Sequence, residues 1–190
     1  MPFLCKIRVI AFAKAKPREL NYGSPGNGTQ GHLVAELFKH SAGFDMQHIP
    51  YKGASGAVVD VVAGNIYAIS TTLTTAGTQI RAGRLRALAI SSAVRLQKYA
   101  SVPTYRETGY PNLVATIWFS LSGPAALPAE IVNRLNSEVR RAMHQPDVLE
   151  RLRPDGIELG TMDAKAFTEF VAAEVKRWAP VVKASGAKRD

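Results

Sequence analysis

The sequence predicts an α/β fold with a largely parallel sheet. Short apolar stretches typical of strands alternate with stretches of helical periodicity along the first two thirds of the chain, as in βαβ units. Glycine-rich turns follow several of the expected strands. The 190 residues are 46% hydrophobic and 21% charged, which is ordinary for a globular protein with its own core.

The first expected element is an amphipathic helix over residues 4–14, because its apolar side chains recur at helical spacing and Pro17 ends the pattern. Lys6 and Arg8 interrupt the apolar stretch, whereas the core of a signal peptide is uncharged. We therefore expect no export signal in this chain. No apolar run approaches the roughly 20 residues of a membrane-spanning helix.

A short strand over residues 20–22 leads into a glycine-rich loop over residues 23–28. Thr29 is a typical N-cap residue and opens the next helix, which Gly43 closes. The apolar residues at helical spacing inside this helix are Leu33, Val34, Leu37 and Phe38.

The same arrangement then repeats. A strand over residues 45–51 is followed by a second glycine-containing loop over residues 52–56. The next helix runs through Val58, Val59 and Val62 and stops at Gly64. A third strand over residues 66–70 precedes a short helix over residues 74–82. This repetition is the basis for expecting parallel strands.

Two further strands are expected over residues 85–91 and 114–122, where apolar residues cluster. Beyond Pro128 the apolar periodicity is helical, and a turn at Pro146 begins another short helix. Residues 157–159 are expected to form a brief strand.

The last helix is expected over residues 163–183. One of its faces carries six large apolar side chains, namely Phe167, Phe170, Val171, Val175, Trp178 and Val182. Soluble monomers rarely leave so large an apolar patch exposed. The stripe therefore predicts a homodimer, with or without exchanged C-terminal segments. The alternative is that this helix folds back on its own chain.

The formal net charge is +9, and the basic surplus lies mainly in residues 1–20 and 73–110. A nucleic-acid interface usually combines basic groups with aromatic side chains on one surface. No aromatic residue separates the arginines at positions 81, 84, 86 and 95. We therefore expect no nucleic-acid partner and interpret the charge as a solvated or anion-attracting surface.

Patterns typical of catalysis are weak. The single cysteine, Cys5, excludes an internal disulfide and a multi-thiolate metal site. The four histidines, at positions 32, 40, 48 and 144, lack metal-ligand spacing. Ser24 lacks the Gly-x-Ser-x-Gly frame of a hydrolase nucleophile. The sequence therefore predicts no enzymatic activity and no cofactor.

The loop between the first strand and the helix opened by Thr29 is the strongest candidate for a binding site. A glycine-rich turn ahead of a helix leaves backbone N–H groups unpaired, which suits an anion. Thr29 stands where a P-loop has its lysine, and the glycine spacing of dinucleotide-binding loops is not met. A carboxylate therefore fits better than a nucleotide phosphate. A tight turn that only caps the helix is the alternative.

Polar loops at three strand ends are expected to meet at one edge of the sheet, where ligands of open parallel sheets bind. The candidate ligand-binding residues are Ser24, Gly26, Asn27, Gly28 and Thr29 in the first loop, and Ser70, Thr71 and Thr72 at the end of the third strand.

Five stretches carry a family resemblance. They are residues 21–29 with His32 and Leu33, residues 49–53, residues 80–89, residues 102–104 with 107–109, and residues 118–119 ahead of 123–125. In order and spacing they are similar to the solute-binding receptors of tripartite tricarboxylate transporters, also called the Bug family. The resemblance covers nearly the whole chain from about residue 6.

This resemblance implies a type II periplasmic-binding-protein-like fold. It also implies a periplasmic receptor that captures a small carboxylate and delivers it to membrane permease subunits, without catalysis. The family's ligand contacts correspond to Ser24, Gly28 and Thr29. At the third strand end the family often has an acidic residue where this chain has Thr71 and Thr72, so recognition of a ligand ammonium group is not expected.

The resemblance further predicts the domain organisation. Residues 1–118 correspond to the second, ligand-binding α/β domain of the receptor. Residues 119–190 correspond to a crossover strand and C-terminal helices of a first domain that is incomplete here. The alternative function is that of a truncated relative, an interaction module that binds no small molecule. A naturally truncated chain without a signal would be cytoplasmic.

Overall fold

The structure, a computed structural model, describes residues 6–152 and 157–187. The chain divides into two compact units. The first comprises the chain up to Ile117 together with the C-terminal stretch from Val181, and the second runs from Trp118 to Pro180. The predicted division near residue 118 into parts of two receptor domains stays a prediction. Cys5 and the start of the helix expected over residues 4–14 lie outside the described residues.

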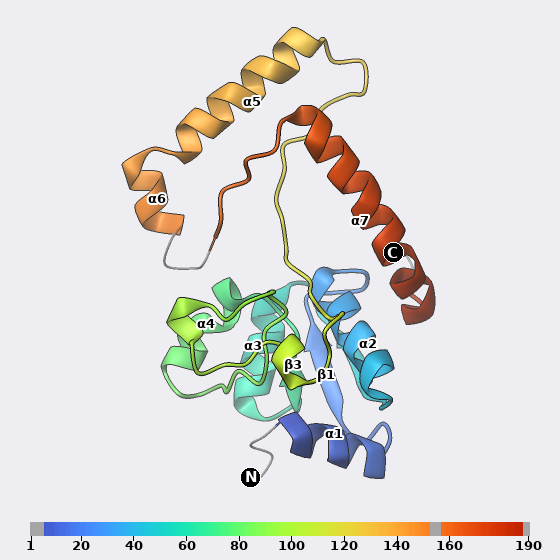
Figure 1. Ribbon diagram of the computed structural model, residues 1–190. Coiled ribbons are helices and arrows are strands. Elements are labelled where there is room, and N and C mark those ends of the chain that lie inside the picture. Colours follow the sequence, from blue (N-terminus) through green and yellow to red (C-terminus); the bar gives the residue numbers. More distant parts are fainter. Residues whose placement is uncertain (1–5, 153–156, 188–190) are drawn as a thin grey trace. The chain divides into compact units, whose positions relative to one another are not determined.

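The first unit alternates helices and strands (Figure 1). Its elements are α1 (Lys6–Ala15), β1 (Asn21–Ser24), α2 (Gln30–Ala42), β2 (Gln47–Pro50), α3 (Ala54–Ala63), β3 (Ala68–Ile69) and α4 (Leu73–Arg81), followed by the 3-10 turns η1 (Gln97–Tyr99) and η2 (Arg106–Thr108). The second unit holds α5 (Ala129–Met143), α6 (Pro146–Leu152) and most of α7 (Ala164–Ser185).

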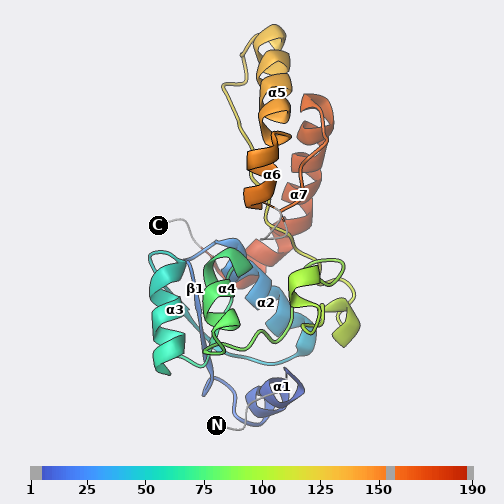
Figure 2. The same cartoon turned by 90° about the vertical axis from the view of Figure 1, so that its left-hand side faces the viewer.

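The three strands form a parallel sheet in the order β2-β1-β3. In this register Tyr22 of β1 lies beside His48 of β2 and Ala68 of β3. Helix α2 lies on one side of β1 and α3 on the other (Figures 1 and 2). The predicted α/β class with a parallel sheet is therefore confirmed. Because each strand is followed by a helix, α2, α3 and α4 all begin at the carboxyl edge of the sheet.

The ends of α2 follow the sequence prediction. The hydroxyl of Thr29 accepts a hydrogen bond from the amide of His32, as an N-cap does. Gly43 ends the helix in the left-handed conformation, with φ 63°, and its amide donates to the carbonyl of Lys39. These caps fix where the loop ahead of α2 stops and the helix begins.

Both predicted glycine-containing loops are shorter than expected. Gly23 and Ser24 are the last residues of β1, since their neighbours in β2 and β3 continue the ladder. Ala54 already begins α3, so the second loop is reduced to residues 51–53. Shorter loops bring the helix starts closer to the strand ends.

Three predicted strands are absent from the described residues. They are those expected over residues 85–91, 114–122 and 157–159. An isolated parallel bridge joins Ile90 to Thr104, and the amide of Ala115 donates to the carbonyl of Ser91. A strand needs a partner along its length, and apolar residues in sequence do not supply one.

The main core of the first unit lies where β1 meets α1 and α2. Its buried residues are Ala13, Leu20, Tyr22, Ala42, Phe44 and Met46. On the α3 side the buried apolar residues include Ala57, Val58, Ile66 and Ala76. Burial of a large apolar side chain contributes about 1.5–3 kcal/mol, so the sheet and its helices have a core of their own.

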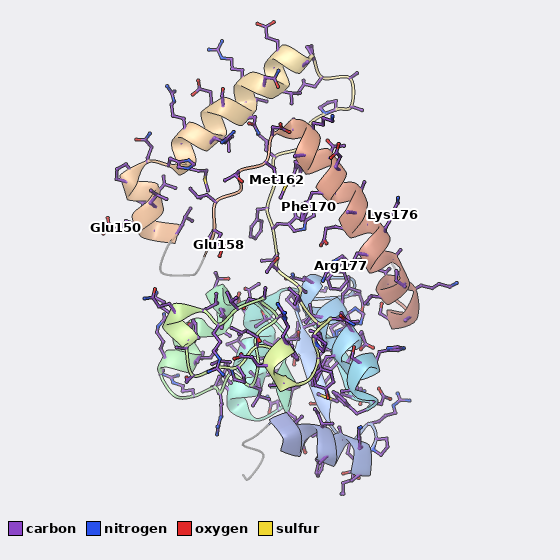
Figure 3. The ribbon with its side chains drawn as sticks, in the orientation of Figure 1. Glu150, Glu158, Met162, Phe170, Lys176 and Arg177 are labelled. Atoms are coloured by element: carbon purple, nitrogen blue, oxygen red, sulfur yellow. The ribbon has the colours of Figure 1, made fainter. Side chains whose placement is uncertain are left out.

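The second unit has little core. Helices α5, α6 and α7 contain no buried residue among those the structure describes. The ring of Trp118 meets those of Phe167 and Phe170 edge to face, with centroids 5.6 and 5.5 Å away. Figure 3 shows Phe170 on the side of α7 that faces the extended chain ahead of α5, and Lys176 turned away from it.

The apolar stripe predicted on the last helix is only partly exposed. Phe167, Phe170 and Trp178 are half-buried, whereas Val175 is 65% exposed. Other exposed apolar residues of the second unit are Trp118, Phe119, Leu121, Ile131, Leu135, Val139, Ile157 and Met162. Over the described ranges, no helix combines the length and the apolar character that crossing a bilayer requires.

Candidate functional site at the carboxyl edge of the sheet

Backbone hydrogen bonds join the end of β1 and the loop after it to the segments that follow β2 and β3. The carbonyl of Pro25 accepts from the amide of Gly53, at 2.9 Å, which ties it to the start of α3. The carbonyl of Gly23 accepts from the amide of Ser70, also at 2.9 Å. The polar segments that follow the three strands are therefore neighbours at one edge.

Gly31, in the first turn of α2, packs closely against the end of β3. A Cβ atom at this position would collide with the carbonyl oxygen of Ser70 and lie 2.9 Å from Cδ of Pro25. Only glycine fits there without displacement of the backbone. The predicted meeting of the first and third loops is thereby confirmed.

The glycine-rich loop satisfies most of its own donors. The amide of Gly28 donates to Nδ1 of His32, at 3.1 Å. The amide of Gly26 donates to Oγ of Ser24, at 3.2 Å, and the amide of Thr29 to the carbonyl of Gly26. The prediction that these N–H groups are unpaired and point outward is therefore wrong. The turn closes on itself because Ser24 and His32 supply the acceptors.

Free donors lie at the helix starts instead. Among the described residues, the amides of Gln30 and Gly31 have no acceptor, as is usual in the first turn of a helix. Helices α3 and α4 begin without a side-chain cap. Each of the three helices therefore directs the positive end of its dipole toward the carboxyl edge.

Hydroxyl groups surround the start of α4. The Oγ1 atom of Thr71 is buried and has no hydrogen-bond partner among the described residues. The hydroxyl of Thr72 lies 2.7 Å from that of Thr74 and 3.1 Å from that of Thr75. A buried hydroxyl without a partner costs about 1–3 kcal/mol. Thr71 is therefore the predicted site residue whose hydrogen bonding is incomplete.

The charge of the edge suits an anion. The segments that form it are residues 24–30, 51–56 and 70–75. They contain no acidic residue and one cation, the exposed Lys52. Of the predicted binding residues, Asn27 and Gly28 are exposed and Thr72 is half-buried, whereas Ser24 has no exposed surface.

Ser24 belongs to a buried network that the sequence reasoning missed. Its Oγ lies 2.7 Å from Nε2 of His48. The imidazole of His48 stacks on that of His32, with ring centroids 4.0 Å apart, and on the ring of Tyr22 at 4.9 Å. The only signal for this contact is the pairing of β1 with β2, which places His48 beside Tyr22.

Burial shifts the pKa values of this network. It lowers the pKa of His48 to about 4, and the neighbouring His32 contributes to the shift. It also lowers the pKa of His32, against the opposing effect of Glu36. The hydroxyl of Tyr22 donates to Glu36 at 2.7 Å, and burial together with this bond raises the pKa of Tyr22. Both imidazoles are therefore neutral at neutral pH.

Ser24 and His48 are residue types that can act as a nucleophile and its base, but a substrate could not reach the hydroxyl of Ser24. Ser24 is 0% exposed, so its hydroxyl lies beyond the reach of a substrate. Among the residues that the structure describes, no three His, Cys, Asp or Glu side chains gather as a metal site would require.

Comparison with known proteins places these features in a family. Residues 2–187 match the family model described as the tripartite tricarboxylate transporter family receptor. Protein BugT of Bordetella pertussis is 37% identical over 180 residues, which cover 95% of this chain and 55% of BugT. The chain spans about half the length of most of the curated relatives it matches.

Several solved structures have a similar fold, and two of them were determined with a bound acid. "R. palustris Rpa4515 with adipate" has a TM-score of 0.86 and 32% identity, over 98% of this chain and 62% of that one. MatC from Rhodopseudomonas palustris with bound malate has a TM-score of 0.84 and 26% identity, over 95% of this chain and 63% of that one. The predicted periplasmic-binding-protein-like fold is confirmed by these similarities.

Proposed function

The chain belongs to the tripartite tricarboxylate transporter receptor family, and we propose that it binds a small carboxylate at the carboxyl edge of its parallel sheet. In this proposal the ligand accepts hydrogen bonds from the free amides that start α2 and from the hydroxyls of Thr71 and Thr72. The exposed Asn27 adds a side-chain amide. The remaining predicted residues (Ser24, Gly26, Gly28, Thr29 and Ser70) shape the loops that hold these donors.

The observation that carries the proposal is the hydroxyl of Thr71. It is buried and has no partner among the described residues, at an edge without acidic side chains. A carboxylate oxygen would accept from this hydroxyl and lie near the positive ends of three helix dipoles. The ligand therefore completes a hydrogen bond that the chain leaves open.

The relatives support a carboxylate as the ligand class. Adipate is present in one similar structure and malate in another, and both are dicarboxylates. The edge of this chain has no acidic side chain to pair with an ammonium group. We therefore propose a dicarboxylate or tricarboxylate without an amine, rather than an amino acid.

The wider role also follows the family. Periplasmic binding proteins are among its members, and we propose a periplasmic location and delivery of the ligand to permease subunits in the membrane. We propose no catalytic role, since the buried Ser24 is the one serine paired with a histidine in the described site.

Binding to this chain alone should be weak. Ligand sites usually enclose 70–90% of a ligand's surface, and one edge of one sheet forms a single wall. We expect dissociation constants of about 1 mM or weaker, equivalent to about 4 kcal/mol.

Thermal unfolding with and without ligand tests the proposal. Adipate and malate should raise the stability of the chain with concentration, and a ligand at 100 times its dissociation constant adds about 2.7 kcal/mol. The matched control is 1,6-hexanediol, which has the length of adipate without its charge. An interaction module that binds no small molecule would respond to none of these compounds.

We also propose that the chain associates with a second copy through the second unit. Among the described residues, α5, α6 and α7 bury no side chain, while Phe119 is 85% exposed and Val175 65%. Two-fold contacts between identical apolar surfaces are self-complementary. Sedimentation at micromolar concentration distinguishes this dimer from a 20.6 kDa monomer.

A further inference from the structure

His32 joins the glycine-rich loop to the buried network beneath it. Its Nδ1 accepts the hydrogen bond of the Gly28 amide, at 3.1 Å, and the residue is 3% exposed. A ring nitrogen of histidine accepts a hydrogen bond only while it carries no proton. The contact with Gly28 therefore requires that Nδ1 of His32 be unprotonated.

The ring of His48 reinforces this requirement. It lies parallel to that of His32, with centroids 4.0 Å apart and 7° between the planes, and its Nε2 lies 2.7 Å from the hydroxyl of Ser24. The two rings thus contact the loop at its beginning, Ser24, and near its end, Gly28. Two imidazolium cations at this separation would repel each other, so the stack favours neutral rings.

The charged groups around the pair do not offset this preference. Oε1 of Glu36 lies 4.0 Å from Nε2 of His32. That carboxylate already accepts from the hydroxyl of Tyr22 and pairs with Lys39 at 2.9 Å. Lys39 in turn pairs with Asp45 at 3.0 Å. Glu36 is therefore already paired, and its opposing effect on the pKa of His32 is smaller than the effect of burial.

We propose that neutral His32 is the residue that positions the glycine-rich loop, and that protonation of the stacked His32–His48 pair releases this loop in acid. A proton on Nδ1 removes the acceptor of the Gly28 amide. The amide then turns toward solvent, and the segment from Ser24 to Thr29 loses a bond that holds its shape. Burial lowers the pKa of both rings, so the loop stays closed at neutral pH. The inference rests on the loop's geometry and requires no ligand.

Nuclear magnetic resonance of the whole chain over pH 7.5 to 4 tests this inference. The amide resonance of Gly28 should shift with the same midpoint as the ring protons of His32, below the ordinary histidine pKa of 6.5. The amide of Gly43, bonded to Lys39 at the other end of α2, serves as the internal reference and should not follow that titration. A Gly28 resonance that ignores the titration of His32 would overturn the proposal.

Variants separate positioning from packing. His32→Asn keeps an acceptor near the place of Nδ1 but does not titrate, so Gly28 should stay protected and lose its pH dependence. His32→Ala removes the acceptor, and protection of the Gly28 amide against hydrogen exchange at pH 7 should fall by about two- to tenfold. His40→Asn, at the exposed end of the same helix, is the matched control and should behave as the unmodified chain.

Two results would contradict the role of His32. One is an unchanged pH response in His32→Asn, and the other is unchanged protection of Gly28 in folded His32→Ala. A response that disappears only in His48→Asn would assign the effect to the other ring. The outcome is independent of carboxylate binding, because every readout is taken without ligand.

Discussion

The imidazole rings of His32 and His48 stack 4.0 Å apart beneath the glycine-rich loop, although 16 positions separate them in the sequence. The parallel pairing of β1 with β2 brings His48 beside Tyr22. Helix α2 places the ring of His32 against the ring of His48. His32 accepts the hydrogen bond of the Gly28 amide, and His48 contacts the hydroxyl of Ser24. In our proposal, the conformation of the loop therefore depends on the protonation of this stacked pair.

The stability of the chain should fall as the pH drops from 6.5 toward 4. Folding lowers the pKa of His48 from the ordinary 6.5 to about 4, so over this window the unfolded chain binds the proton and the folded chain does not. The loss should reach about 1–3 kcal/mol. Urea unfolding at pH 7 and pH 4.5 measures it. His48→Gln should flatten the dependence and His40→Gln should not; equal stabilities of the unmodified chain at both pH values would refute the assignment.

Gly31→Ala should destabilise the chain by about 1–3 kcal/mol. The added methyl group collides with the carbonyl of Ser70 and crowds Pro25, so either α2 or the end of β3 must shift. Gly160→Ala is the control, because a Cβ there meets nothing within 4 Å. Denaturant unfolding compares the two variants. Equal midpoints would show that the first and third loops are not in close contact.

Thr71→Val should weaken carboxylate binding without lowering the stability of the ligand-free chain. Replacing a buried hydroxyl that has no partner with a methyl group of the same shape should leave the ligand-free chain as stable or more stable by about 1 kcal/mol. The stabilisation by adipate should decrease. Thr74→Val, which removes an exposed hydroxyl bonded to Thr72, is the control. Thermal unfolding with and without adipate measures both effects. A marked loss of ligand-free stability in Thr71→Val would mean that its hydroxyl already has a partner.

Phe119→Ser together with Val175→Ser should dissociate the proposed dimer without unfolding the chain. Both side chains are exposed and belong to the second unit, so their replacement removes apolar surface without creating a cavity. Sedimentation velocity and circular dichroism measure assembly and folding separately. An unmodified chain that sediments as a monomer at micromolar concentration would exclude the dimer.

The sequence was most informative where structure is set locally. Thr29 and Gly43 bound α2 as predicted, because N-cap and left-handed C-cap residues act through their own backbone neighbours. The prediction of a strand over residues 114–122 was wrong, because a strand depends on a partner that is distant in the sequence. Its apolar residues are in place and Ala115 bonds to Ser91, but no ladder with a neighbouring strand runs along them in the part of the chain that the structure describes.

The same distinction applies to the site. The order of strands and helices was enough to predict the position of the glycine-rich loop and its proximity to residues 70–72. It was not enough to predict the hydrogen bonding of the loop's amides, because the acceptor for Gly28 is His32, in the first turn of α2, and the ring of His32 stacks on that of His48. Treating the histidines one at a time, by metal-ligand spacing, could not reveal a stacked pair.

A carboxylate site can be both detected and located by titrating the isotopically labelled chain with adipate and following its amide resonances. We predict saturable shifts of the amides of Gln30, Gly31, Thr71 and Thr72, with a dissociation constant of about 1 mM or weaker, and no such shifts with 1,6-hexanediol. Shifts confined to other parts of the chain, or equal shifts with the uncharged diol, would contradict a carboxylate site at the carboxyl edge of the sheet.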